Sequence, residues 1–408
     1  MKLKKVFCFV FILICFSSAK SQVLTIDSIK AIIEKQYPEL AMYNLQVKAY
    51  DAYAEGAKSW DPPQIGTGLY MTPYNFEKNM GSYMISIQQM IPNPSKQKAN
   101  QQYMQAMSSV DVQNEKAAAN ELYALAKSDY AEWIILKKKK VVLAESEELL
   151  NYIIKVSEIR YPYEQEKLNN IYKAKAALGE LQNMQIMIEN EILQKQISLN
   201  TLMNRDKSTV FDIDTNYTIK NYESEIVDTI TISASRSDIK SIDQEIKLAQ
   251  LKQQLEWSKR LPEFGIKYDN MFAFGTTPNQ FSIMGMITIP IVPWSSKMYK
   301  SNVAGINYEI AAFQKQKESL VNETSGEIMS LQSQIKSKKL QLALYKDNII
   351  PALEKNYKTT LLAYDQNTED LFSVLDAWQS LKMGRVEYLE QVKDLLLLQV
   401  EFEKQIEK

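Results

Sequence analysis

The feature that most constrains the fold of this chain is a long stretch without helix-breaking residues. Proline is absent between Pro94 and Pro162, and glycine is absent between Gly81 and Gly179. Proline interrupts helix hydrogen bonding and glycine raises the entropic cost of ordering the backbone, so this stretch favours one continuous helix. We expect a helix over residues 95–160, which would extend about 100 Å at 1.5 Å per residue.

A second long helix is expected further along the chain, from Ser296 towards Ala363. Pro351 lies within "NIIPALEKN" and should bend this helix or interrupt it locally. The whole chain has only 11 Gly and 12 Pro in 408 residues. Long uninterrupted elements are therefore expected, and the chain should be mainly α-helical.

The two long helices belong to two copies of one sequence pattern. "YPELAMYNLQVKAYDAYAEGAKSWDPPQIGTGLY" at residues 37–70 can be laid on "RSDIKSIDQEIKLAQLKQQLEWSKRLPEFGIKY" at residues 236–268. "QQMIPNPSKQK" matches "IPIVPWSSKMY" in the same way. Later matches are Tyr161 with Tyr364 and Leu168 with Leu371. The shared order of these matches indicates a duplication.

Each copy is predicted to run helix, strand, strand, very long helix, turn and long helix. The first copy covers residues 22–205 and the second covers residues 235–408. Residues 206–234 between them are rich in Asp, Asn and Thr, and we interpret this segment as a linker.

The predicted strands alternate between two kinds of side chain, as half-buried strands do. One face of residues 280–289 carries Phe281, Ile283, Ile287 and Ile289, and the other carries Ser282, Met284, Met286 and Thr288. The first copy sets Tyr83, Ile85 and Ile87 against Ser82, Ser86 and Gln88. An ordinary soluble hairpin with one wet face has the same pattern.

The last predicted helix has apolar residues at alternating steps of three and four, the spacing of helices that pack in coiled coils. Leu371, Val374 and Trp378 belong to this row, and we expect them to pack between helices. Asp376 stands beside them. Its position needs an explanation, because burying an unpaired carboxylate is costly.

The first residues, "MKLKKVFCFVFILICFSSAKSQ", combine a basic start, an apolar core and small residues, the arrangement of a secretory signal peptide. Cleavage is expected before Gln22, which makes residues 1–21 the signal peptide. The alternative is a lipoprotein signal using Cys15, although Ile14 occupies a position where acylated cysteines need a small residue. A retained membrane helix is disfavoured, because the apolar run is short.

The chemistry open to the mature chain is narrow. The chain has no histidine, and its only cysteines, Cys8 and Cys15, lie in the predicted signal peptide. Zinc sites, Cys–His or Ser–His nucleophile pairs and CxxC redox motifs are therefore excluded, and no glycine-rich nucleotide motif occurs. We expect no enzyme and no cofactor. The balance of 48 basic and 49 acidic residues also argues against nucleic acid as a partner.

Methionine is the remaining soft metal ligand in this chain. Met84, Met90, Met271, Met284 and Met286 lie in or near the predicted strands. Thioethers can bind Cu(I), but methionine more commonly fills irregular apolar surface, so we predict no metal site. The lysine run at residues 137–140 is interpreted as a solvated helix face.

Four strands per chain cannot close a membrane barrel alone, because spanning barrels leave no free edge and small ones need about eight strands. If these strands cross a membrane, several chains must share one barrel. Three chains would supply twelve strands. Each chain would then donate a four-stranded section, and the long helices would continue the same cylinder on one side of the membrane.

The order of elements, with "YDQNTEDLFSVLDAWQSL" followed by "RVEYLEQVKDLLLLQVEFEKQI", resembles the TolC-type outer-membrane efflux protein family. The resemblance covers nearly the whole mature chain, and "SIQQMIPNPSKQK" is among its most specific pieces. "QMIPNPSK" and "IVPWSSK" are also similar to the heavy-metal cation efflux branch, of the CzcC and CusC kind.

The resemblance implies a homotrimer in the outer membrane of a Gram-negative cell, surrounded by outer-membrane lipid. Its fold would be mainly α with a membrane β-barrel section: a trimeric 12-stranded β-barrel, with four strands per chain, continued by a long α-helical barrel in the periplasm. It implies an exit duct that passively conducts metal cations or small toxic compounds. Its partners would be a periplasmic adaptor protein and an inner-membrane transporter of the RND type. The rival interpretation is a periplasmic coiled-coil structural or adaptor protein without a membrane barrel.

In this family the segment matching "YDQNTEDLFSVLDAW" forms a helix–turn–helix tip and the periplasmic entrance of the pore. By that match, Asp376 is the entrance aspartate, repeated around the trimer axis, and Tyr364 helps to hold the closed state. Ser373 stands where a second aspartate is often found, so the ring should carry fewer charges. Asp370 is a further acid at the entrance, and Glu369 replaces a basic latch residue.

The resemblance also implies that both tips dock on the adaptor. Asn367 replaces the usual tip glycine but can adopt the same left-handed turn. The first tip has Lys173 where Asp376 would fall, so we expect the second tip to dock more typically. The residues expected at the docking tips are Tyr161, Pro162, Tyr163, Asp365 and Asn367.

Two charged residues are expected inside the barrel. Lys267 and Asp269 alternate with Phe264, Ile266 and Tyr268 along one predicted strand. Because successive side chains point to opposite faces of a strand, we predict that Lys267 and Asp269 face the lumen.

Overall fold

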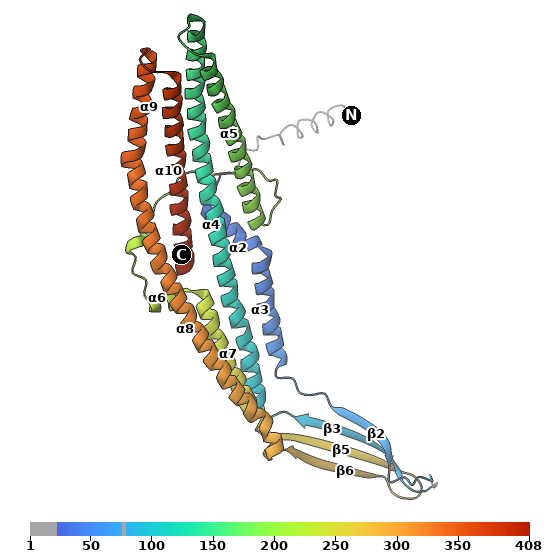
Figure 1. Ribbon diagram of the computed structural model, residues 1–408. Coiled ribbons are helices and arrows are strands. Elements are labelled where there is room, and N and C mark those ends of the chain that lie inside the picture. The colour runs from blue at the N-terminus through green and yellow to red at the C-terminus, as the bar shows by residue number, and fades with distance from the viewer. Residues whose placement is uncertain (1–22, 76–78) are drawn as a thin grey trace, which may run out of the picture. The chain divides into compact units, whose positions relative to one another are not determined.

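The computed structural model describes residues 23–75 and 79–408 (Figure 1). The predicted signal peptide, with Cys15, lies outside the described residues. The described chain forms two compact units, and each of them draws on both sequence copies. Unit 1 contains the residues up to Ala41 together with Ala118–Ser235 and Thr324–Lys408, and unit 2 contains Met42–Ala117 and Arg236–Glu323.

Helices follow the predicted order in both copies (Figure 1). In the first copy they are α2 (Ile26–Gln36), α3 (Pro38–Gly56), α4 (Pro94–Arg160) and α5 (Leu168–Leu202). In the second they are α7 (Ser237–Ser258), α8 (Pro293–Leu344), α9 (Ile350–Asp365) and α10 (Leu371–Ile406), preceded by the short α6 (Thr229–Ser235). The uninterrupted helix expected over residues 95–160 is confirmed by α4.

The second long helix is interrupted where Pro351 predicted it. A π-helical turn, Tyr345–Ile349, separates α8 from α9, and Pro351 follows at the start of α9. Proline has no N–H to bond the carbonyl four residues earlier, and its ring crowds that carbonyl. A wider turn before the proline relieves the crowding while the chain continues in the same helical sense.

One antiparallel sheet lies within unit 2. Its strands are β2 (Gln64–Tyr70), β3 (Ser82–Ile91), β5 (Glu263–Ala273) and β6 (Gln280–Thr288), in the order β2-β3-β5-β6. The central β3–β5 pair joins the two sequence copies, with Ser86 opposite Asp269. Strands β2 and β6 are the two edges of this sheet.

The faces of the sheet follow the predicted alternation. Ile87, Tyr268 and Ile283 are register partners across three strands and share the apolar face. That face is open: Ile65 and Phe281 are each 69% exposed. A soluble hairpin packs its apolar face on a core, so the large exposed apolar side chains here do not fit the soluble alternative.

The core of unit 1 lies between α4, α5, α9 and α10. Leu371, Val374 and Trp378 are at most 2% exposed and belong to one buried cluster with Leu150 and Leu181. The predicted packing of the first three residues between helices is therefore confirmed. The Trp378 indole N–H also donates to the Ser146 carbonyl at 3.1 Å, which satisfies the one polar group of that ring.

The segment between the two sequence copies packs on unit 1. A two-residue strand, β4 (Asp212–Ile213), pairs in parallel with β1 (Val23–Leu24). Phe211 and Tyr222 are buried, and the Phe211 ring meets the Trp133 ring edge-on with centroids 5.0 Å apart. These aromatic anchors fix the segment to the helices.

The interpretation of residues 137–140 as a solvated helix face is wrong. Lys139 is only 8% exposed and forms an ion pair with Glu390. Lys137 pairs with Asp212 at 2.6 Å, in the β4 segment. A charge run gives no information about which partners the tertiary structure brings opposite it.

Among residues 23–75 and 79–408, no helix combines the length and the apolar character needed to cross a membrane.

Candidate functional site

Two helical hairpin tips lie at one end of unit 1, α4–α5 and α9–α10 (Figure 1). The first tip turns through a 3₁₀ segment, Tyr161–Tyr163, and then Glu164 with φ 59°. The second turns at Asn367 with φ 60°. The predicted left-handed conformation of Asn367 is therefore confirmed. Asparagine is well suited to this conformation, whereas glutamate adopts it at a steric cost.

The two tips have the same register but different chemistry. Tyr161 and Tyr364 each lie three residues before the left-handed residue, as the sequence match requires. Tyr161 is 44% exposed, whereas Tyr364 is 2% exposed. The two tips therefore share the turn, but only the second tyrosine is part of the packed interior.

Tyr364 connects the second tip to the first. Its hydroxyl donates to Glu166 Oε2 at 2.9 Å and lies 3.1 Å from Ser157 Oγ. The guanidinium of Arg160 lies over the Tyr364 ring, 4.3 Å from its centroid, and Nη1 donates to the Tyr364 carbonyl at 2.7 Å. Burial and the Glu166 carboxylate raise the pKa of the Tyr364 hydroxyl, so it remains a donor at neutral pH.

Arg160 is the cation that sequence reasoning missed. The resemblance put a basic latch at the position of Glu369, where this chain has an acid. Arg160 comes instead from the last turn of α4 and also donates to the Asp365 carbonyl at 3.2 Å. A basic residue in the last turn of a helix is itself a signal, because it complements the carbonyl end of that helix.

Asp370 and Ser373 form a helix cap. Asp370 Oδ1 accepts from the Ser373 N–H and from Ser373 Oγ, each at 2.9 Å, so Asp370 is the N-cap of α10. These bonds hold the pKa of Asp370 below its ordinary value. The predicted entrance roles of Asp370 and Ser373 stay predictions, but both side chains also have a local structural role.

A polar cavity of about 470 Å³ lies between the two tips and is lined by residues of both. Arg160 and Lys167 contribute its positive charges. Its acidic lining residues are Glu164, Glu166, Glu369 and Asp370. Acids outnumber bases, so the cavity favours cationic groups.

The predicted docking residues are accessible. Tyr163 is 73% exposed, and Pro162, Asp365 and Asn367 are exposed as well. Tyr161, at 44%, is exposed too. Docking of an adaptor on these residues stays a prediction.

Asp376 lies on α10 with an exposed side chain. Its neighbours Leu375 and Ala377 are buried, at 6% and 2% exposure. Within the described part of the chain, its carboxylate has no hydrogen-bond or ion-pair partner. Its first-tip counterpart, Lys173, is placed differently, with Nζ 3.8 Å from the centre of the Phe372 ring. The pore-lining role of Asp376 stays a prediction.

The two predicted lumen residues lie on the polar face of the sheet. Lys267 Nζ is 3.0 Å from Asp269 Oδ1, and Ser86 Oγ donates to the same oxygen at 2.5 Å. Asp269 is 4% exposed. The charges of Lys267 and Asp269 therefore neutralise each other. The strand methionines share this face through the register, as Met84 is opposite Met271 and Met284 is opposite Lys267.

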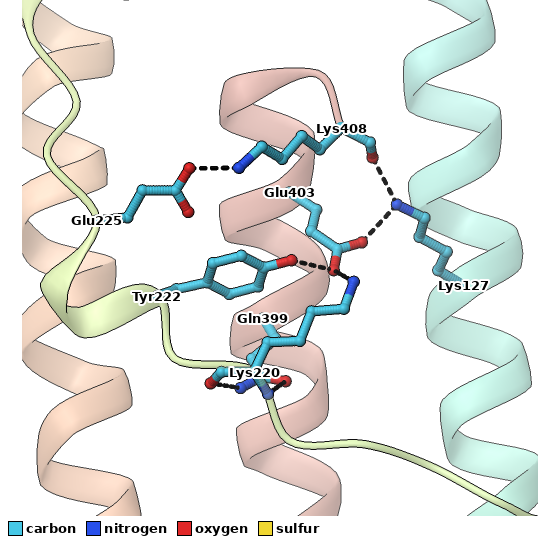
Figure 2. Close-up of polar contacts among 7 residues, drawn as sticks. All are labelled: Lys127, Lys220, Tyr222, Glu225, Gln399, Glu403 and Lys408. Carbon is cyan, nitrogen blue, oxygen red and sulfur yellow. Dashed lines mark hydrogen bonds and ion pairs between the residues drawn. The ribbon is translucent and has the colours of Figure 1, made fainter.

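A buried carboxylate near the end of α10 was not predicted. Glu403 is 7% exposed. It accepts hydrogen bonds from Lys127 Nζ at 2.5 Å, from Lys220 Nζ at 2.7 Å and from the Tyr222 hydroxyl at 2.6 Å (Figure 2). These partners come from α4 and from the segment between the two sequence copies, so one carboxylate joins three parts of unit 1.

Gln399 extends this contact by one helical turn. Its amide donates to the Lys220 carbonyl at 2.8 Å and accepts from the Lys220 N–H at 3.3 Å (Figure 2). The Tyr222 ring stacks on Phe402 with centroids 4.7 Å apart. We call Lys127, Lys220, Tyr222, Gln399 and Glu403 the Glu403 clamp. Gln399 and Glu403 are polar residues four positions apart on a helix side that is otherwise apolar. Residues at this spacing lie on the same side of a helix, so the sequence did contain a signal for this contact.

Charge and burial act in opposite directions in the Glu403 clamp. Burial alone would raise the pKa of Glu403, but bonds from Lys127, Lys220 and Tyr222 outweigh it and hold that pKa below its ordinary value. Burial and the same carboxylate raise the pKa of Tyr222 to about 12. Glu403 is therefore ionised, and Tyr222 is a neutral donor, at physiological pH.

In the described residues, no group of three or more His, Cys, Asp or Glu side chains is arranged to hold a metal ion.

No protein-family model and no curated protein matches this sequence. Solved structures do match its fold. The outer membrane protein VceC from Vibrio cholerae has a TM-score of 0.74 and 14% identity, covering 93% of this chain and 95% of that one. The outer-membrane channel MtrE of Neisseria gonorrhoeae has a TM-score of 0.68 and 14% identity, over 93% and 88% of the two chains.

CusC, described as undergoing conformational changes on transmembrane channel formation, has a TM-score of 0.75 and 12% identity, over 93% of this chain and 91% of that one. VceC fits as well as CusC does, so the heavy-metal branch stays a prediction. The fold predicted from the resemblance, long helices combined with a four-stranded section of sheet, is confirmed. The chain therefore has the fold of the TolC-like outer-membrane channel proteins.

Proposed function

We propose that this protein is the outer-membrane exit duct of a tripartite efflux pump. The observation that carries the proposal is the exposed apolar face of the sheet, formed by side chains such as Ile65, Phe281 and Ile283. Burial of this face in lipid removes apolar surface from water, which is the main favourable term in membrane association. The fold shared with outer-membrane channel proteins supports the same conclusion.

The edges of the sheet support assembly as a trimer. In the described part of the chain, strands β2 and β6 each pair on one side only. Unpaired backbone groups are very costly in hydrocarbon, so a membrane sheet has to close on itself. Three protomers, with β6 of each paired to β2 of the next, give a closed barrel of twelve strands. Lys267, Asp269 and the strand methionines then face its lumen.

The tips are the proposed contact with a periplasmic adaptor. Their cavity carries more acids than bases, and Tyr163 beside it is largely exposed. An adaptor with a basic group and a small apolar surface is the complementary partner. The adaptor would connect the duct to an inner-membrane transporter, for which the RND type is our proposal.

The second tip is the proposed gate. Tyr364 and Arg160 hold α9 against α4 through hydrogen bonds and a cation–π contact. In a trimer, Asp376 would be repeated around the axis, and a ring of carboxylates in a narrow opening attracts cations. Metal cations or small toxic compounds are the proposed cargo, carried passively through the duct.

Planar bilayers test the proposal directly. The purified protein, extracted from outer membranes, should form heat-modifiable trimer bands on gels and give single-channel conductance steps. A water-soluble monomer that gives no conductance would overturn it. That result would favour the rival interpretation, a periplasmic coiled-coil or adaptor protein without a barrel.

A further inference from the structure

A cavity of about 280 Å³ lies within unit 2, among α3, α4, α7 and α8. Tyr50, Tyr103 and Phe313 supply three aromatic rings from three of these helices. Leu248 and Ala249 of α7 are among its apolar lining residues. Small-molecule sites combine such an apolar lining with a few polar groups that fix orientation, and the volume is near the lower end for such sites.

Three carboxyl groups line the same cavity, and one of them, Glu309 of α8, is paired with a lysine. Asp111 comes from α4 and Glu245 from α7. Asp111 accepts one hydrogen bond from the Asn114 side chain. Within the described part of the chain, Glu245 has no hydrogen-bond or ion-pair partner, although it is half-buried. A partly buried carboxylate without a partner is unfavourable unless a cation accompanies it.

The remaining charges of the cavity cancel. Lys252 Nζ is 3.1 Å from Glu309 Oε2, so the lysine is already occupied by a carboxylate. Among the residues that line the cavity, Asp111 and Glu245 therefore remain as an uncompensated double negative charge. The interior attracts cations and repels anions.

The aromatic rings decide what kind of cation fits. A hydrated metal ion needs several oxygen ligands and gains little from apolar walls. An organic cation can place its charge beside the carboxylates and its flat apolar body against the rings, where cation–π attraction adds to burial. We propose that this cavity, formed by Asp111 and Glu245 among Tyr50, Tyr103 and Phe313, is a binding site for aromatic organic cations.

The site titrates through its carboxyl groups. Burial raises the pKa of both Asp111 and Glu245 above the ordinary values. The other titratable groups that line it are Tyr50 and Tyr103, Lys252 and Glu309. Protonation of Asp111 and Glu245 as the pH falls removes the attraction for a permanent cation, so binding should weaken in acid.

Ethidium is a suitable probe, because its positive charge does not change with pH. Its fluorescence anisotropy should report binding to the purified full-length protein in a neutral detergent. The double variant Asp111→Asn/Glu245→Gln should bind ethidium at least tenfold more weakly. The control Glu55→Gln/Glu323→Gln removes the same charge from exposed positions outside the cavity and should bind as the unmodified chain does.

Phe313→Leu removes one ring and no charge, and it should weaken binding about threefold. This variant keeps the proposal testable if the double variant does not assemble. Equal binding by the unmodified, double and Phe313 variants would overturn the site. An equal loss in the double variant and its control would also overturn it, because the effect would then be general surface charge. Ethidium binding does not require conductance, so this site and the proposed duct can fail independently.

Discussion

The hydroxyl of Tyr364 donates a hydrogen bond to Glu166 at 2.9 Å, although 198 residues separate the two in sequence. The contact joins equivalent turns of the two sequence copies. Glu166 also accepts from the Lys167 N–H and the Asn170 amide, so it is held at the start of α5. Tyr364 is therefore fixed to the first tip through a carboxylate that is itself immobilised.

Tyr364→Phe should loosen the second tip. The change removes the hydroxyl's hydrogen bond to the Glu166 carboxylate and its contact with Ser157, and leaves the ring and its Arg160 contact in place. A bond of this kind contributes about 1.5 kcal/mol, so the open fraction of each tip should rise about tenfold. Single-channel recordings measure this as longer or larger openings. Tyr163→Phe changes an exposed tyrosine and serves as the control; equal recordings from both variants would count against the gate.

Asp376→Asn should weaken block by divalent cations added from the periplasmic side. The carboxylate is exposed and without a partner in the described chain, so its loss should leave trimer assembly intact. Block measured in planar bilayers should require about tenfold more cation. Glu369→Gln removes the same charge from the tip turn and should have a smaller effect. If block by the Asp376 variant is unchanged, the residue does not line the pore.

Ile283→Lys should impair membrane assembly, whereas Met284→Lys should not. The two residues are adjacent on β6, and their side chains lie on opposite faces of the sheet. A lysine on a lipid-facing position of a barrel costs about 2–4 kcal/mol near the midplane. The yield of heat-modifiable trimer in outer-membrane fractions measures the difference. A similar yield from the two variants would contradict the proposed lipid-facing surface.

Glu403→Gln should destabilise unit 1 by about 3 kcal/mol, because it leaves Lys127 and Lys220 without their buried partner. Glu158→Gln is the matched control. It breaks an exposed pair with Lys175 at 2.7 Å, and such pairs contribute little. Urea unfolding followed by circular dichroism compares the two. If both variants unfold at the same urea concentration, the Glu403 clamp does not stabilise the fold.

The effect of Glu403 should depend on pH in a defined direction. Its folded pKa lies below the ordinary value, so its contribution is present above about pH 4.3, the usual pKa of glutamate, and is lost as the pH falls through the folded pKa. The difference between the unmodified chain and Glu403→Gln should therefore shrink in acid. The pKa of Tyr222 is about 12 in the folded chain, whereas an ordinary tyrosine has a pKa of about 10. Deprotonation of Tyr222 therefore favours the unfolded chain and lowers stability only as the pH rises above about 10.

Local rules predicted much of this fold. The breaker-free run gave α4, Pro351 marked the π turn, and the period of two placed Lys267 and Asp269 on one face of the sheet. The capping role of Asp370 was also available, because an aspartate three residues before a serine at a helix start is a local pattern. Each of these features depends on residues close together in the chain.

The contacts that make up the tip and the Glu403 clamp were beyond such rules. These contacts join helices that are distant in sequence, as Arg160 with Tyr364 and Lys127 with Glu403 show. The rotation of each helix about its axis decides whether such side chains meet. The sequence by itself determined the elements, the turns and the polarity of the strands. Only the tertiary structure decided that Tyr364 is buried and Asp376 is exposed. The physical reason is that the packing of neighbouring helices determines which side of α9 and of α10 is buried and which side stays in contact with solvent.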